Sequence, residues 1–258
     1  MGNSEPMMTP DEVDEELRND FFRQALNVLN ESQVPFMVGG AYAFERYTGI
    51  ARRTKDMDIF TRPQDVRQLL AVLARAGYGT ELTDPMWLAK AFYTGYLLDI
   101  IFSSGNWLCT VDDLWLEHAV VDEVLGIPVR LCPPEEMIWQ KSYIMERERF
   151  DGADVAHMIR ALGPTIDWRR LLDRMADHKD VLLAHIILYR FAYPFEQDAV
   201  PAWVMKELLN DMGLAPAPSG EGERLCRGTL LSRYQYLVDL QEWNYLDARI
   251  HVQRSAAA

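Results

Sequence analysis

Three aspartates, Asp56, Asp58 and Asp99, have the residue type and the spacing of carboxylates that hold metal ions. Asp56 and Asp58 stand two residues apart in the strand-like run Asp-Met-Asp-Ile-Phe, and because side chains alternate along a strand, both carboxylates point to one face. Two like charges that close are unfavourable unless a cation lies between them. Mg²⁺ prefers oxygen ligands and commonly takes one or two protein carboxylates together with substrate phosphates. The pair is therefore suited to bridging two metal ions.

Asp99 is the candidate for a third carboxylate from a neighbouring strand. It stands in the middle of Leu-Leu-Asp-Ile-Ile-Phe, an otherwise apolar run. A buried aspartate without a partner costs free energy, and a metal ion is a partner that fits. Three carboxylates around paired metal ions favour transfer of a phosphorus-containing group.

Two glycines, Gly39 and Gly40, precede Asp56, with fifteen residues between Gly40 and Asp56. They separate a short apolar strand expected over 34–38 from a short helix expected over 41–47. Glycines in this position let backbone N–H groups approach phosphate oxygens, where the helix dipole also favours negative charge. A glycine pair alone is weak evidence, but together with the three aspartates it predicts a phosphate-binding turn.

The elements that must position these residues alternate between strands and helices. A capping pattern at Thr9-Pro10-Asp11-Glu12 opens a helix that runs to about Ser32. A Thr94-Gly95 turn joins two strands into a hairpin, and the second strand carries Asp99. The other elements expected here are strands over 57–60, 90–93, 96–102 and 128–131 and a helix from Pro63 to Gly77.

Beyond Pro133 the apolar pattern changes to that of helices. A loop rich in Pro, Gly and Ser, Ala215–Gly222, interrupts this half. The helices expected are 135–149, 155–162, 168–176, 181–189, 203–212 and 230–249. The chain is therefore expected to divide near Pro133 into a half with strands and helices and a helical half.

Composition limits the class of protein. The chain has 258 residues, enough for one large or two small domains, and three Cys at unrelated spacings, which favour a reducing cytoplasm. No apolar run approaches the length of a membrane span. The formal charge is −13, with 39 acidic and 26 basic residues, which disfavours a long polyanion as partner and favours neutral or cationic ones.

These residues together resemble the DNA polymerase β-like nucleotidyltransferase superfamily, whose members share a Gly-Gly turn, an Asp-x-Asp strand and a later strand Asp. The match is closest to small bacterial nucleotidyltransferases, a branch with abortive-infection toxin-like and antibiotic-modifying members. In that branch Arg-x-Thr precedes the Asp pair. Here Thr54 follows Arg53 directly, and Arg52 restores the spacing. The branch often continues with a Pro-Glu-Glu helix, a Lys, an Arg and an Asp, and this chain is similar over Pro134-Glu135-Glu136, Lys141, Arg149, Asp151 and Asp154.

The resemblance covers about residues 34–162 and implies an α+β fold. A mixed-sheet nucleotidyltransferase domain over 9–132 would precede a helical domain over 133–258. The implied reaction moves a nucleoside monophosphate from a nucleoside triphosphate such as ATP to an acceptor hydroxyl, with pyrophosphate leaving. Asp56, Asp58 and Asp99 would hold Mg²⁺ or Mn²⁺, and Asp99 would also help to deprotonate the acceptor. The residues expected to bind the nucleotide are Gly39, Gly40, Arg53, Thr54 and Lys141.

Several of these residues also have plainer interpretations. Lys141 is as consistent with a solvated helix lysine as with a phosphate contact, and Arg52 and Arg53 with surface charges. Asp151 and Asp154 are better explained as helix caps than as metal ligands. The Trp and Tyr residues of the helical half recur near helical spacing, which favours a core over an aromatic cage.

Three functions remain open at the level of sequence. The first is an enzyme that modifies a small molecule, and the acidic balance favours a cationic acceptor. The second is a nucleotide-binding regulatory protein without turnover, which has less need of all three aspartates. The third is a toxin-like transferase acting on tRNA, which would need a basic face, and Arg160, Arg169, Arg170 and Arg174 offer only a modest one.

Overall fold

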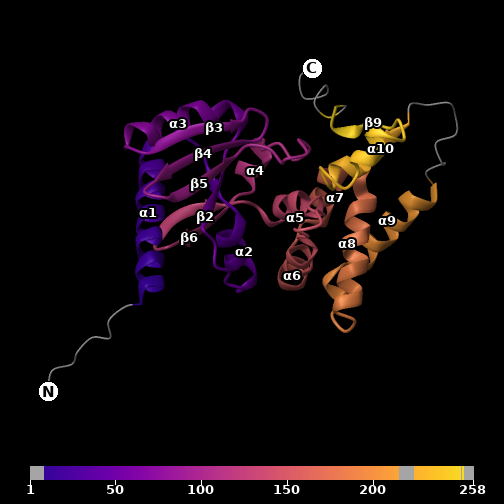
Figure 1. Ribbon diagram of the computed structural model, residues 1–258. Coiled ribbons are helices and arrows are strands. Elements are labelled where there is room, and N and C mark those ends of the chain that lie inside the picture. The colour runs from indigo at the N-terminus through magenta and orange to yellow at the C-terminus, as the bar shows by residue number, and fades with distance from the viewer. Residues whose placement is uncertain (1–8, 215–223, 251, 253–258) are drawn as a thin grey trace. The chain divides into compact units, whose positions relative to one another are not determined.

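The computed structural model describes residues 9–214, 224–250 and 252 of the chain (Figure 1). The chain divides into two compact units. The first takes in the chain up to Tyr42, Ala51–Phe102 and Val111–Leu131. The second takes in Ala43–Ile50, Ser103–Thr110 and the chain from Cys132 onward. The expected division into two parts near Pro133 is therefore too simple. Two segments that precede this residue, Ala43–Ile50 and Ser103–Thr110, belong to the second unit.

A mixed seven-stranded sheet forms the centre of the first unit (Figure 1). Its strands lie in the order β3-β4-β5-β2-β1-β7-β6, with the pairs β2–β5 and β1–β7 parallel and the other pairs antiparallel. The strands are β1 (Met37–Val38), β2 (Asp56–Phe60), β3 (Gly79–Asp84), β4 (Leu88–Tyr93), β5 (Tyr96–Ile101), β6 (Val120–Val124) and β7 (Ile127–Leu131). Strands β2 and β5, which carry the predicted carboxylates, therefore have a neighbour on each side.

Helix α1 (Pro10–Ser32) begins at the predicted capping residue. The Glu12 N–H donates to the Thr9 hydroxyl at 3.4 Å, and the Thr9 N–H donates to the Glu12 carboxylate at 2.7 Å. This reciprocal pair satisfies two N–H groups that the helix itself leaves without acceptors, so the predicted capping box is confirmed. Of the apolar side chains that recur every four residues along α1, the first two, Val13 and Leu17, are 43% and 54% exposed. Those of the later turns are buried.

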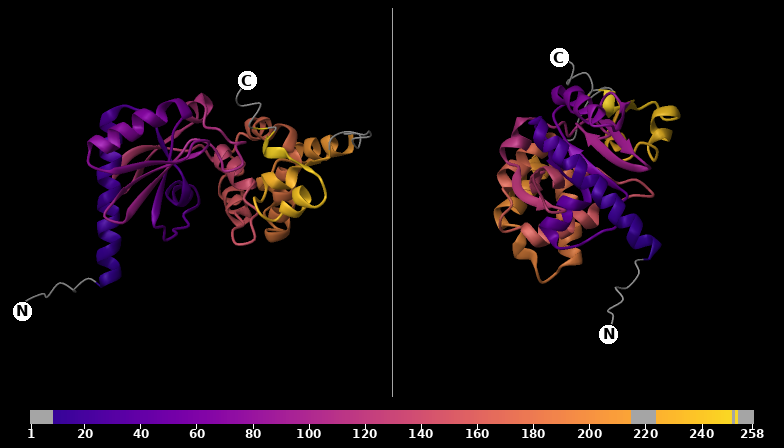
Figure 2. Two further views of the ribbon diagram at one scale, coloured as in Figure 1. Left: turned by 45° about the horizontal axis from the view of Figure 1, so that its top comes forward. Right: turned by 90° about the vertical axis from the view of Figure 1, so that its left-hand side faces the viewer.

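Helices α1 and α3 (Val66–Arg75) pack beside each other and against the sheet (Figure 2). Phe21 of α1 contacts the ring of Tyr96 on β5, with centroids 5.9 Å apart. Alternation along β5 places Tyr96 on the same face as Leu98 and Ile100, which are fully buried. Asp99 must therefore point to the opposite face of the sheet from α1.

A short helix that the sequence pattern did not predict, α4 (Asp113–Glu117), lies in the first unit. The Asp112 carboxylate caps it by accepting the Leu114 and Trp115 N–H groups. Trp115 is fully buried and stacks on Phe60 of β2, with ring centroids 5.5 Å apart. The stacking supports the end of the strand that carries Asp56 and Asp58.

The second unit is mainly helical. Its helices are α5 (Pro134–Ser142), α6 (Gly152–Leu162), α7 (Trp168–Met175), α8 (Lys179–Ala192), α9 (Ala202–Leu214) and α10 (Leu237–Gln241), with the later part of α2 (Gly40–Thr48) and the short parallel strands β8 (Leu225–Cys226) and β9 (Leu246–Asp247). The predicted α+β fold class is confirmed. The predicted loop Ala215–Gly222 lies outside the described residues.

Buried ion pairs join α5 to α7 inside this unit. Arg170 donates to Glu136 at 2.7 Å and pairs with Glu135, and Arg174 donates to Glu136 at 3.1 Å. Burial raises the pKa of Glu136 above its ordinary value, although the charges of both arginines oppose that shift. Such a network costs desolvation free energy but ties the helices to one relative position. The pairs explain the position of Glu135 and Glu136 without a ligand.

Two predicted helices are wrong over part of their length. The predicted helix 135–149 ends at Ser142, and the chain then turns back so that Met145 pairs with Phe150. Within the predicted helix 230–249, α10 takes up five residues, because the chain beyond it turns at Asn244 (φ 57°) to form β9. Helical residues begin again at Ala248. None of the helices in the described residues is both long and apolar enough to cross a bilayer.

Candidate active site

Asp58 on β2 and Asp99 on β5 are direct partners in the register of two parallel strands. Side chains of paired residues lie on the same face of a sheet, so both carboxylates point away from the face that α1 covers. Asp56 shares this face because it stands two residues before Asp58. All three side chains are only partly exposed.

Gly40, the first residue of α2, lies directly against the carboxylate of Asp58. Its φ is +53°, a conformation that glycine adopts with little strain. A Cβ added at Gly40 would stand 1.7 Å from Oδ2 of Asp58, far inside contact distance. The second glycine is thus required by the close approach of an aspartate as well as by its backbone conformation.

Gly39 has a different part in the site. Its N–H donates to the backbone carbonyl of Asp58 at 2.9 Å, which continues the pairing of β1 with β2. That N–H is therefore already used inside the protein. Any contact of this turn with a phosphate group falls to the first turn of α2 rather than to the Gly39 amide.

Thr54 holds the carboxylate of Asp56. Its hydroxyl lies 2.7 Å from Oδ1 of Asp56 and 3.0 Å from the backbone carbonyl of the same residue. A hydrogen bond from a hydroxyl fixes the direction of the carboxylate that accepts it. Thr54, expected as a nucleotide-binding residue, is thus a partner of the first aspartate. Arg53 beside it is exposed.

Lys90 on β4 is a residue of this site that was not among the residues predicted from the sequence. It pairs in register with Asp99, and its Nζ lies 3.0 Å from Oδ1 of that carboxylate. The signal was present in the sequence, because a two-residue turn at Thr94-Gly95 makes Tyr93 pair with Tyr96. Counting back three residues on one strand and forward three on the other gives Lys90 opposite Asp99.

The oxygen donors at this face fit a hard divalent cation. Two carboxylates lie side by side, and Oδ1 of Asp99 is buried without a hydrogen bond, its contact with Lys90 having the distance but not the directions of one. Within the described part of the chain, no three His, Cys, Asp or Glu side chains gather closely enough to hold a metal ion. Phosphate oxygens of a substrate commonly complete the ligands of Mg²⁺.

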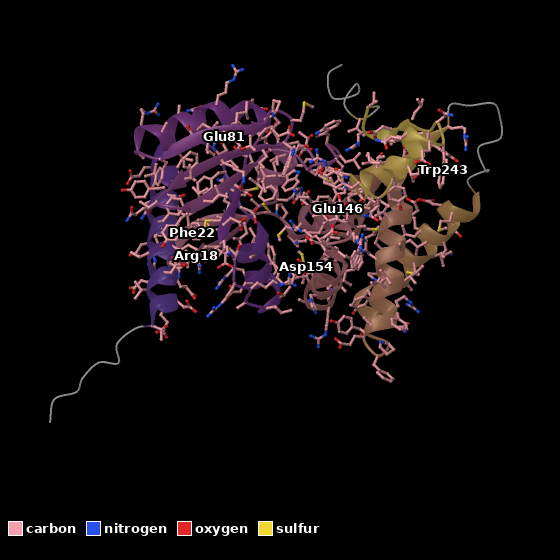
Figure 3. The ribbon with its side chains drawn as sticks, in the orientation of Figure 1. Arg18, Phe22, Glu81, Glu146, Asp154 and Trp243 are labelled. Carbon is pink, nitrogen blue, oxygen red and sulfur yellow. The ribbon has the colours of Figure 1, made fainter. Side chains whose placement is uncertain are left out.

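Lys141 lies in the second unit, where two buried aspartates bind its ammonium group. Its Nζ donates to Asp151 and to Asp154, each at 2.7 Å. Asp154 belongs to α6 and is labelled in Figure 3. Burial alone would raise the pKa of Asp151, but the hydrogen bond from Arg149 and the charge of Lys141 outweigh it and hold that pKa below its ordinary value. The interpretation of Lys141 as a solvated lysine is therefore wrong.

The interpretation of Asp151 as a helix cap is also wrong for its side chain. Asp151 stands at the position before α6, but its carboxylate makes no capping hydrogen bond there. It binds Lys141 and Arg149 instead. A buried charge pair outweighs an exposed cap in this position because two charges left unpaired would cost more.

Solved structures give only distant likenesses. The antibiotic-resistance factor ANT(2'')-Ia is 17% identical, with 76% of this chain and 98% of that one covered and a TM-score of 0.40. The lincosamide antibiotic adenylyltransferase LnuA, solved with lincomycin bound, is 17% identical over 55% and 94%, with a TM-score of 0.39. An antigenic nucleotidyltransferase-like protein from Paracoccidioides brasiliensis is 16% identical over 75% and 95%, with a TM-score of 0.44. No conclusion about substrate follows from such similarity.

A family described as uncharacterised nucleotidyltransferase matches residues 16–195. The match takes in well over half of the chain, including the three aspartates, the two glycines and Lys141. No protein of curated function matches the sequence. The resemblance drawn from the motifs is confirmed at this level, and the chain is an enzyme of the nucleotidyltransferase type. It belongs to this family of nucleotidyltransferases.

Proposed function

We propose that the enzyme transfers a nucleoside monophosphate from a nucleoside triphosphate to the hydroxyl group of a small acceptor. A divalent metal ion would be held by Asp56, Asp58 and Asp99 together with phosphate oxygens of the bound nucleotide. The observation that carries the proposal is the register of β2 and β5, which sets Asp58 beside Asp99 on one face. Two neighbouring carboxylates repel each other, so a cation between them lowers the free energy of the arrangement. Mg²⁺ or Mn²⁺ bound there would neutralise phosphate charge as the bond to phosphorus breaks.

The chain's own residues prepare both reactants. Thr54 fixes the direction of the Asp56 carboxylate, and the bare Cα of Gly40 lets Asp58 approach α2. The helix start at Gly40 favours an anionic group nearby, which suits a triphosphate. Asp99 takes the proton of the acceptor hydroxyl. The acceptor oxygen forms a bond to the α-phosphorus, the bond from that phosphorus to the bridging oxygen breaks, and pyrophosphate leaves with the electron pair.

Arg53 and Lys141 differ as proposed nucleotide ligands. Arg53 is exposed and stands three residues before Asp56, so it can meet a triphosphate at little cost. Lys141 must first give up two hydrogen bonds of 2.7 Å to buried aspartates. Removing the lysine ammonium from those buried carboxylates would cost several kcal/mol, about 3–5 by analogy with broken buried pairs. Arg53 is therefore the stronger of the two.

The charge of the chain supports a small acceptor. At a formal charge of −13 the surface repels a long polyanion and attracts an amine-bearing molecule. The three cysteines are all buried and free, which suits a reducing compartment such as the cytoplasm. We therefore propose a cytoplasmic enzyme whose acceptor carries both a hydroxyl and a positive charge.

The test is incubation of the full chain with each of the four α-labelled nucleoside triphosphates, Mg²⁺ and a panel of amine-bearing polyols. We expect pyrophosphate release together with label on the acceptor. Asp58→Asn should abolish both, while Asp198→Asn, a change at an exposed aspartate, should alter neither. Nucleotide binding without pyrophosphate release would favour a regulatory protein, and label on added tRNA would favour the toxin-like transferase.

A further inference from the structure

Four charged residues form a row across the face of the sheet that holds the proposed site. The cross-strand pairs are Glu81 with Lys90, Lys90 with Asp99, and Asp99 with Asp58, on β3, β4, β5 and β2 in order. Cβ atoms of such pairs lie about 4.5–5.5 Å apart, within reach of direct electrostatic interaction. The charges along the row are negative, positive, negative and negative. Lys90 is the cation within this row.

The ammonium of Lys90 lies on the Asp99 side. Nζ is 3.0 Å from Oδ1 of Asp99, and both side chains are largely screened from water, at 28% and 19% exposed. The same Oδ1 is buried and receives no hydrogen bond. The contact is therefore an ion pair without the geometry of a hydrogen bond, so another cation can replace the ammonium more easily.

We propose that Lys90 is the resident counter-cation of Asp99, occupying the place where a divalent cation would otherwise compensate that carboxylate. The inference rests on the proposed function only for the assignment of Asp58 and Asp99 as metal ligands. A cation that binds Asp99 has to displace Lys90 or bear its repulsion. The lysine thereby limits metal binding in the absence of nucleotide and holds the Asp99 carboxylate on the β4 side.

Glu81 gives Lys90 a second place to go. It is exposed and pairs in register with Lys90 on the side away from Asp99. A lysine has a long flexible stem, so its ammonium can turn from one cross-strand neighbour to the other without movement of the backbone. If the Lys90 ammonium were displaced from Asp99, the Glu81 carboxylate would therefore compensate the lysine charge.

The experiment measures Mn²⁺ alone, without nucleotide, by electron paramagnetic resonance titration of the full chain. Lys90→Met should tighten Mn²⁺ binding at least about tenfold, because it removes a positive charge close to the cation and leaves Asp99 without a partner. Lys90→Arg keeps the charge and should restore wild-type affinity. Lys206→Met, a change at an exposed lysine of α9, is the matched control and should leave the affinity unchanged.

The same titration in an Asp99→Asn background tests whether Lys90 acts through Asp99. There Lys90→Met should change the affinity less than twofold, since the carboxylate that the lysine compensates is gone. If circular dichroism shows that Lys90→Met does not fold, Lys90→Gln replaces it in every comparison. Equal Mn²⁺ affinity in wild type and in the neutral Lys90 variant would overturn the inference, and so would an equal gain in the Asp99→Asn background.

The outcomes separate this inference from the proposed function. Tighter Mn²⁺ binding in the Lys90 variant with no nucleotide transfer by the wild type would support the counter-cation and count against the enzyme activity. Transfer by the wild type with unchanged Mn²⁺ affinity in the variant would do the reverse.

Discussion

The Cα of Gly40 and the carboxylate of Asp58 lie in such close approach that a Cβ on Gly40 would stand 1.7 Å from Oδ2. Gly40→Ala must therefore move the carboxylate and also take an L residue to φ +53°. We expect a loss of about 1–3 kcal/mol in unfolding free energy from the backbone alone, and a fall in transfer rate of about 100-fold or more. Urea unfolding and pyrophosphate release measure the two effects.

Gly49 at the end of α2 provides the control for that change. Its φ is +72°, but a Cβ there would meet nothing within 4 Å. Gly49→Ala should cost a similar backbone strain and leave transfer unchanged. Equal loss of activity in both variants would show that strain, and not the position of Asp58, is responsible.

Asp58→Asn tests the carboxylate itself. Removing one of two neighbouring negative charges should abolish Mg²⁺-dependent transfer and leave the metal-free fold as stable as before or about 0.5 kcal/mol more stable. Thermal unfolding in EDTA and a single-turnover assay give the two numbers. A variant that transfers at the wild-type rate would remove Asp58 from the proposed site.

Lys141→Met should destabilise the protein by about 3–5 kcal/mol, because it leaves Asp151 and Asp154 buried without their common partner. Lys206→Met, at an exposed position, should change the stability by less than about 0.5 kcal/mol. Denaturant unfolding measures both. Unchanged stability together with a raised KM for the nucleotide would instead assign Lys141 to nucleotide binding.

His185 makes stability depend on pH. Its Nε2 donates to the Ser142 carbonyl at 2.9 Å in the neutral tautomer, and its Nδ1 is buried without a partner. Burial lowers the pKa of His185 below 6.5, so a proton binds the unfolded chain before it binds the folded one. The free energy of unfolding should therefore fall as the pH drops from about 6.5 toward the lower pKa of the folded protein. Above about pH 6.5, His185 should contribute no further change with pH.

The variant His185→Gln retains a donor for Ser142 and should flatten that part of the pH profile. His118→Gln, a change at an exposed histidine, should leave the profile as it is. Urea unfolding at several pH values between 5 and 8 compares them. An unchanged slope in His185→Gln would assign the pH dependence to another group, such as His178, whose pKa burial also lowers.

The parts of the fold that depend on local sequence could be predicted. Thr9 and Glu12 lie within one turn of each other, and the Thr94-Gly95 turn joins adjacent strands, so neither the helix start nor the hairpin needs a residue distant in the sequence. The early end of α5, in contrast, depends on a distant segment. The run after Ser142 is rich in Glu and Arg and favours a helix by propensity, yet the Glu146 carboxylate accepts the Arg233 N–H at 2.8 Å and the Ser232 hydroxyl.

The candidate site divides in the same way. The positions of Asp56, Asp58 and Asp99 on strands followed from alternation and from apolar neighbours. The partners of Lys141 could not follow, because a lysine on an amphipathic helix has the same local pattern whether water or a carboxylate faces it. Lys90 was accessible through the hairpin register, which fixes Asp99 opposite it.

The length of the Thr94-Gly95 turn has a consequence for how this enzyme can vary. Loop tips usually tolerate insertions and deletions, because little depends on their length. Here the turn sets which residue of β4 stands opposite Asp99, while β5 is held separately by its parallel pairing with β2. One added or lost residue would slide β4 by a position and turn its alternate side chains to the other face. Among relatives that keep a lysine opposite this aspartate, the other surface loops should vary in length, whereas this turn should keep its two residues.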